Sequence, residues 1–175
     1  MFDDMLEAWR AAPLADGEPI PRKKAFKPAT ISQHLHNIGL AEHLGEGRLR
    51  IRLAGSNSWE FWGSETTGAD YHDMPGEVPD DVMMPPMILM ALFNQPCGMR
   101  SLREAVDNDG NIWQCDMFSL PFANDEGIAA YLLYGYRIFP VDESRPQAWE
   151  PGFADLSTAT LLGATFVDLG FGVPG

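Results

Sequence analysis

The stretch that decides the fold of this chain is Arg48-Leu49-Arg50-Ile51-Arg52-Leu53-Ala54-Gly55, in which three arginines alternate with three aliphatic residues. A repeat of two places the aliphatic side chains on one face and the arginines on the other, so the stretch predicts a β-strand with one buried and one solvated face. Gly45-Glu46-Gly47 is typical of a turn, and residues 37–44 before it are predicted to form the partner strand.

The second half of the chain carries the signals of an antiparallel meander. Residues 98–107 and 111–122 flank Asp109-Gly110, a dipeptide typical of hairpins, and a turn at 124–127 leads into an apolar strand over 128–140. Two strands, a helical interval and three strands predict an α+β fold, with a five-stranded antiparallel sheet and short helices across one face.

Two cysteines, Cys97 and Cys115, fall on the first of these hairpins. If Asn108 pairs with Asn111, Cys115 lies opposite Glu104, more than about 20 Å from Cys97 at roughly 3.3 Å per residue. A disulfide cannot span that distance, so both residues are predicted to be free thiols in a reducing compartment.

Helices are predicted at the N-terminus and between the two groups of strands. The first covers about residues 3–12, and the second covers about residues 80–95 and becomes regular close to Pro85 and Pro86. The chain is thereby divided into three predicted parts, which are an N-terminal helical cap and arm (1–36), a central domain (37–140) and a C-terminal extension (141–175). The extension is expected to be a docked arm or a partly ordered linker.

The composition is that of a globular chain, with 45% hydrophobic and 21% charged residues. The formal net charge of −13 argues against a nucleic-acid partner, and no apolar run is long enough to span a membrane. Eight of the twelve Lys and Arg lie before residue 53, where we expect a solvated face; a basic patch for an acidic partner is the alternative. The N-terminus has no basic, apolar signal segment, which favours a cytoplasmic location.

Short motifs run through nearly the whole chain: Trp9-Arg10, Ile20-Pro21-Arg22, Pro28, Ile31, Leu35, Ile38, Arg50, Arg52-Leu53-Ala54-Gly55, Gly63, Thr67-Gly68, Leu120-Pro121-Phe122 and Asp168-Leu169-Gly170-Phe171-Gly172-Val173-Pro174. Together with the order of elements, they resemble the PAS domain superfamily. The resemblance is to a family of small stand-alone PAS-like proteins found mainly in alphaproteobacteria, PAS fold family five. Ser56 stands where a threonine is expected, a small change that should not alter the fold.

The resemblance implies a sensory or interaction module without catalysis, in which residues 37–140 form the PAS-like domain. PAS domains commonly enclose a cavity between the sheet and the helices, and many form dimers. The resemblance identifies no cofactor, no metal and no ligand for this chain.

Methionine and aromatic residues of the helical interval are suited to lining an apolar pocket, because methionine is unbranched and adapts to irregular shapes. We expect a pocket formed by Trp59, Phe61, Trp62, Met84, Met87, Met90, Phe93 and Met117. The alternative is that these side chains form an ordinary core.

Metal and cofactor chemistry finds little support in the sequence. His34 and His36 point to different sides of a helix, and no further ligand follows at zinc spacing. His72 is the candidate axial ligand of a PAS haem, with a surface position as the alternative. Asn94-Gln95-Pro96-Cys97 lacks the run that surrounds the reactive cysteine of flavin photosensors, so Cys97 is expected to begin a strand.

Asp116 is the one acid inside an apolar strand. If it points inward, burial raises its pKa and it can act as an acid or base. We expect it to point outward, where it is solvated or pairs with an arginine on a neighbouring strand.

These observations favour a non-catalytic sensory module that binds a small apolar or amphipathic ligand and signals through a homodimer or a protein partner. One alternative is a protein-interaction module with a filled core and no ligand. Another is a small cone-shaped α+β enzyme that uses Asp116 or His72 as its base.

Overall fold

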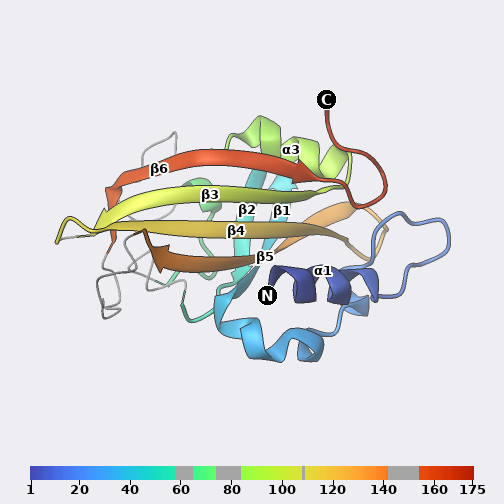
Figure 1. Cartoon of the computed structure of the whole chain (residues 1–175). Helices are drawn as coiled ribbons and strands as arrows, with labels where there is room; N and C mark the ends of the chain where they lie inside the picture. Colours follow the sequence, from blue (N-terminus) through green and yellow to red (C-terminus); the bar gives the residue numbers. More distant parts are fainter. Residues whose placement is uncertain (58–64, 74–83, 108, 142–153) are drawn as a thin grey trace.

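A computed structural model describes residues 1–57, 65–73, 84–107, 109–141 and 154–175. Its centre is one antiparallel sheet in the order β2-β1-β5-β4-β3-β6 (Figure 1). The strands are β1 (Ile38–Gly45), β2 (Arg48–Leu53), β3 (Gly98–Asp107), β4 (Ile112–Ala123), β5 (Ala129–Pro140) and β6 (Ala154–Val167). The predicted α+β class and antiparallel pairing are confirmed, and the sheet has six strands where five were expected.

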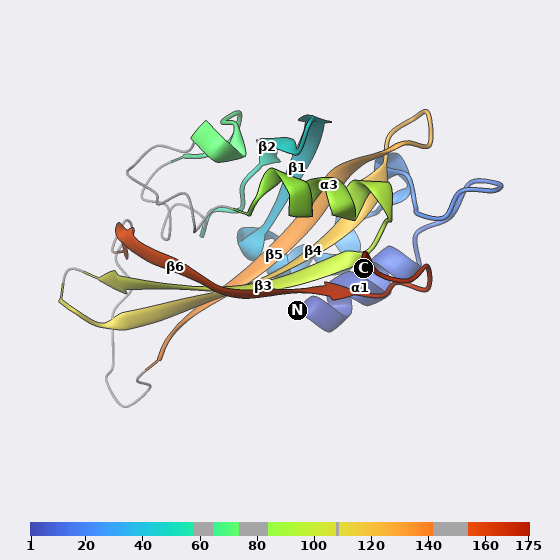
Figure 2. The same ribbon diagram turned by 90° about the horizontal axis from the view of Figure 1, so that it is seen from above.

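Helices pack on both faces of the sheet (Figure 2). The α-helix α1 (Phe2–Arg10) and the 3₁₀ segment η2 (Pro28–Asn37) cover what we call the outer face, which carries Phe118 and Leu120 of β4. The helix α3 (Pro86–Asn94) covers the inner face, which carries Met99 and Leu132. The short 3₁₀ turns are η1 (Lys23–Ala25) and η3 (Tyr71–Asp73). In the described part of the chain, no helix has the length and hydropathy that a bilayer span requires.

The N-terminal helix packs with one side against the outer face. Met5 and Trp9 are buried, and the Trp9 indole donates a 2.7 Å hydrogen bond to the carbonyl of Pro121. The helix begins at Phe2, one residue earlier than predicted, and no side chain caps its N-terminus. Asp4 instead pairs with the N-terminal amine and with the ring of His34, which ties α1 to η2.

The hairpin of β1 and β2 forms as the alternating arginines predict. Leu49 and Ile51 are buried, and the arginines of β2 lie on the opposite side, where they pair with Asp70 and Glu42. Residues 45–47 turn the chain with positive φ angles. A Cβ atom at Gly47 would lie 2.5 Å from the carbonyl oxygen of Pro86, so this glycine lets the turn approach the start of α3.

The register of the β3–β4 hairpin differs by one residue from the prediction. Asp107, not Asn108, pairs with Asn111, and Cys115 therefore lies opposite Arg103. The cause is the Asp107 carboxylate, which accepts hydrogen bonds from the backbone N–H groups of Asp109 and Asn111 and closes a longer turn. Both cysteines are free, as expected, and both are buried.

The sixth strand comes from the C-terminal extension. For this segment the sequence allowed two alternatives, a docked arm and a partly ordered linker. β6 pairs antiparallel with β3 from Gly98↔Val167 to Asp107↔Ala154, with two register shifts. One internal glycine, and the glycines and prolines on either side of the strand, concealed it in the sequence. Gly163 is the one glycine within it, and an added Cβ there would meet no atom within 4 Å.

Candidate ligand-binding cavity

A cavity of about 60 Å³ lies between the inner face of the sheet and α3. Most of its wall is aliphatic or thioether surface, contributed by the side chains of Ala41, Leu49, Ile51, Met84, Leu89, Met99, Met117 and Leu132. The strands on one side of the cavity and α3 on the other hold these side chains in place.

One wall of the cavity is polar, because the side chain of Arg103 lies there, and this residue is only 2% exposed. Its guanidinium donates to Ser101 Oγ at 3.0 Å, to Tyr71 Oη at 2.9 Å and to the Met117 sulfur at 3.1 Å. Ser119 adds a second hydroxyl to the lining. The cavity therefore joins a large apolar surface to a compact group of hydrogen-bonding atoms.

Two tyrosines connect this polar wall to its surroundings. Tyr71 Oη accepts a 3.2 Å hydrogen bond from the backbone N–H of Met84, so one phenol links η3, the residues before α3 and Arg103. Burial raises the pKa of Tyr134, which keeps this phenol protonated, and its hydroxyl lies 3.5 Å from the carbonyl of Leu53. Both tyrosines also line the cavity.

The predicted pocket residues that the structure describes fall into three groups: some line the cavity, one is buried beside it and others are exposed to solvent. Met84 and Met117 line the cavity. Phe93 is buried next to it, where its ring stacks on His43 at 4.3 Å between centroids. Met87 is 80% exposed and Met90 is 39% exposed.

Met87 and Met90 are exposed because of the way α3 is rotated about its own axis. Its first residue is Pro86, and Leu89, Leu92 and Phe93 turn toward the sheet, which leaves Met87 and Met90 on the solvent side. Trp59, Phe61 and Trp62 lie outside the described residues, and so does the side chain of His72.

Sequence reasoning missed Arg103, Ser101, Ser119, Tyr71 and Tyr134. A signal for three of them was present, because residues two apart on a strand share a face. Met117 was a candidate, and its neighbour Ser119 and its cross-strand partner Ser101 share its face in the observed register. Arg103 follows Ser101 by two residues on β3.

Asp116 points away from the cavity, to the outer face, and is 3% exposed. It accepts hydrogen bonds at 2.9 and 2.7 Å from Arg100 on β3 and at 2.8 Å from Arg137 on β5. Burial opposes its ionisation, but the two arginines outweigh burial and hold the pKa of the carboxyl below its usual value. It thus points outward and pairs with arginines on the neighbouring strands, as expected.

An antiparallel sheet with helices on its faces and a small cavity under one of them defines an α+β module suited to binding. The chain belongs to the PAS domain family, whose sequence model matches residues 3–135. PAS domains are sensory and regulatory modules, and the match includes α1 together with the first five strands up to residue 135. Comparisons with curated proteins and with solved structures returned no match.

Proposed function

We propose that this PAS domain is a non-catalytic cytoplasmic sensor that binds a small amphipathic molecule in the cavity under α3. The observation that carries the proposal is the guanidinium of Arg103, buried in the wall of an otherwise apolar cavity. Ligand sites typically combine apolar walls with a few converging polar groups, and this cavity has that composition.

The polar wall indicates how a ligand would be oriented. An oxygen-bearing end would face Arg103, Ser101 and Ser119, and an aliphatic or aromatic body would contact Leu89 and Leu132. The three methionines of the lining can change rotamer to suit different shapes. The volume of about 60 Å³ is well below the roughly 300–1,000 Å³ of drug-sized sites, so a ligand must displace these flexible side chains.

Movement of the lining offers a route for a signal. Met84, two residues before α3, and Leu89 within it both belong to the wall, and the Tyr71 hydroxyl is hydrogen-bonded to the Met84 backbone and to Arg103. A ligand that separates these groups would shift α3 against the sheet. We propose that the shift is passed to a second copy of the chain or to a partner protein.

The test is a thermal-shift and calorimetric screen of the full chain against straight-chain carboxylates, the matching alcohols and aromatic acids, with native mass spectrometry of the purified protein. A ligand at about one hundred times its Kd should stabilise the fold by about 2.7 kcal/mol. Ser119→Leu, which fills the cavity, should abolish the response. Met87→Ala, on the solvent side of α3, is the matched control and should respond like the wild type.

The second candidate is an interaction module with a filled core, and the small volume of the cavity is the observation that favours it. This candidate replaces the first if no compound stabilises the protein, none co-purifies, and Ser119→Leu leaves association with other chains unchanged.

A further inference from the structure

We infer that the outer face of the sheet carries a second binding site, in which Arg100 and Arg137 receive the carboxylate of a small organic acid. The site is a groove across strands β5, β4, β3 and β6, with a volume of about 430 Å³, which we call the outer groove. The sheet separates this groove from the cavity under α3, so the inference does not depend on the proposed function.

The two arginines are held in place by one buried carboxylate and one aromatic ring. Asp116 accepts hydrogen bonds from Arg100 at 2.9 and 2.7 Å and from Arg137 at 2.8 Å. The Phe2 ring of α1 packs against both guanidinium groups, and its centroid lies 4.8 Å from Cζ of Arg137 and 5.7 Å from Cζ of Arg100. Because side chains that are already ordered lose less rotamer entropy on binding, this arrangement prepares both groups for a ligand.

The outer groove presents positive charge to solvent. Both arginine side chains are more than half exposed, whereas the side chain of Asp116 is 5% exposed. Two positive charges against one negative charge leave a local excess of one positive charge, in a chain whose formal net charge is −13. Glu104 of β3 does not line the groove, and it accepts a 3.1 Å hydrogen bond from Gln114. The local charge therefore favours a singly charged anion.

Both guanidinium groups have donors beyond those that Asp116 uses. Among the residues that the structure describes, Arg137 donates to Asp116 through Nη2, and Arg100 does so through Nε and Nη2. A guanidinium carries five N–H groups in a planar fork, and the spacing of the fork matches the two oxygens of a carboxylate. An incoming carboxylate can therefore accept hydrogen bonds from these side chains without displacing Asp116.

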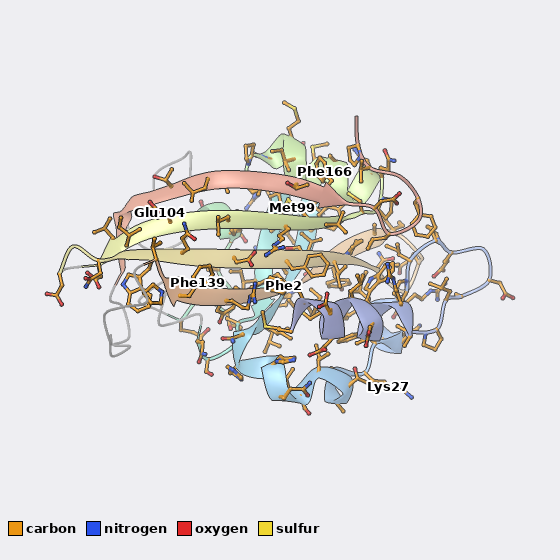
Figure 3. All side chains as sticks on the ribbon, viewed as in Figure 1. Phe2, Lys27, Met99, Glu104, Phe139 and Phe166 are labelled. Atoms are coloured by element: carbon orange, nitrogen blue, oxygen red, sulfur yellow. The ribbon has the colours of Figure 1, made fainter. Side chains whose placement is uncertain are left out.

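The rest of the outer groove suits an apolar body attached to that carboxylate. Phe139 of β5 and Leu162 of β6 line it, and Leu162 is 48% exposed. Figure 3 shows Phe139 on the same face of the sheet as Phe2. Gly163 also lines the groove, next to a register shift of β6, and an added Cβ there would meet no atom within 4 Å. Such a glycine within a strand often marks a bulge or a place where a ligand approaches the backbone closely.

The experiment titrates benzoate, which joins one carboxylate to a flat apolar ring, into the full chain while NMR follows the backbone amide signals. Benzoate should bind with a Kd of about 1 mM or tighter, with the largest shifts at Arg100, Arg137 and Gly163. Benzamide has the same shape and no charge, and it should bind about tenfold more weakly, because charge-assisted hydrogen bonds are the stronger ones. Added salt should weaken the binding of benzoate.

Two variants test the arginines and the groove separately. Arg137→Gln removes one guanidinium and should raise the benzoate Kd by about tenfold or more. Thr165→Glu adds a negative charge at an exposed groove residue, keeps both arginines, and should weaken binding by a similar factor. Ser32→Glu is the matched control, because it adds the same charge at an exposed residue of η2 that does not line the groove, and its Kd should equal that of the wild type.

Circular dichroism and the melting temperature establish that each variant is folded, and Thr165→Glu carries the test if Arg137→Gln does not fold. The inference is overturned if benzoate shows no saturable binding up to about 20 mM, where a Kd of about 1 mM would be saturated. Equal affinity for benzamide also overturns it, as do shifts confined to cavity residues such as Leu89 and Leu132. So does a benzoate Kd that every folded groove variant leaves unchanged.

Discussion

At the tip of the β3–β4 hairpin, one carboxylate organises the turn. Asp107 accepts hydrogen bonds from the backbone N–H groups of Asp109 and Asn111, from the Asn111 amide and from the Trp113 indole, at 2.8 to 3.1 Å. Burial opposes the ionisation of Asp107, but these donors outweigh burial and lower its pKa to about 2. The group is therefore stabilised as a carboxylate in the folded chain.

Replacement of this carboxylate should destabilise the fold. We expect Asp107→Ala to lower the free energy of unfolding by about 2 kcal/mol, because several hydrogen bonds to a charged acceptor are lost. The folded-state pKa lies below the ordinary value of 3.8, so the contribution is present above pH 4 and is lost as the pH falls toward 2. Urea unfolding of the wild type and of Asp107→Ala, measured between pH 2 and pH 4 and above, checks this pH dependence. Asp109→Ala, an exposed acid of the same turn, should change neither the stability nor its acid limb.

The two cysteines should be unreactive while the chain is folded. Burial raises the pKa of Cys97 to about 11 and that of Cys115 to about 12, so almost no thiolate is present at neutral pH. Labelling with a thiol reagent should be slow in buffer and fast in denaturant, with both thiols counted by mass spectrometry. Rapid labelling of the native protein would contradict the burial of these side chains.

Among the elements, the β1–β2 hairpin and α3 are joined by one histidine. The His43 ring stacks on Phe93 at an interplanar angle of 7°, and its Nε2 accepts a 3.2 Å hydrogen bond from the backbone N–H of Gly47. Only a neutral ring can accept at that atom, and burial lowers the pKa of His43 below 6.5. The hairpin and the cavity-forming helix thus share a contact that depends on the neutral imidazole.

This contact should make stability depend on pH. Because the folded-state pKa is lowered, the contribution of His43 is complete above pH 6.5 and is lost as the pH falls below that value. We expect His43→Phe, which keeps an aromatic ring against Phe93, to remove part of the fall in melting temperature between pH 6.5 and about 5. His36→Gln, at an exposed ring, should leave the fall unchanged, and an unaltered pH profile in His43→Phe would contradict the assignment.

The sequence predicts some of these elements well and others poorly, for physical reasons. β2 is recognisable because its two faces differ completely, with arginines on one side and Leu49 and Ile51 buried on the other. In α3 nearly every residue is apolar, so periodicity cannot decide that Met87 faces solvent while Leu89 faces the sheet.

The candidate site was only partly predictable because β3 mixes polar and apolar residues on both faces. Met99 and Arg103 face the cavity, whereas Arg100 and Leu102 lie on the outer face. Polar and apolar residues do not alternate along such a strand, so the sequence of β3 alone cannot predict that Arg103 is buried. The tertiary contact with Tyr71, 32 residues away in the sequence, is what identifies it as part of a site.

In the whole molecule, β3 and β4 carry two different surfaces. Met117 and Ser119 of β4 line the cavity on the inner face, and Asp116 of the same strand lies on the outer face, where it pairs with Arg100 and Arg137. A ligand that moves the inner side chains therefore acts on strands that reach the opposite surface of the molecule. Since coupling between two binding events is reciprocal, ligand binding and the proposed association with a second copy should alter each other by the same factor.

The coupling proposed between the cavity and a second copy of the chain can be measured in both directions. A compound found by the cavity screen should change the dissociation constant for self-association, measured by sedimentation, by a factor within the roughly 5- to 150-fold range usual for coupled sites. The ligand Kd per chain should differ by the same factor between dilute protein, in which the chains are separate, and concentrated protein, in which they associate. Equal ligand affinity at both protein concentrations would contradict the coupling, because a ligand that does not distinguish separate from associated chains cannot shift their populations.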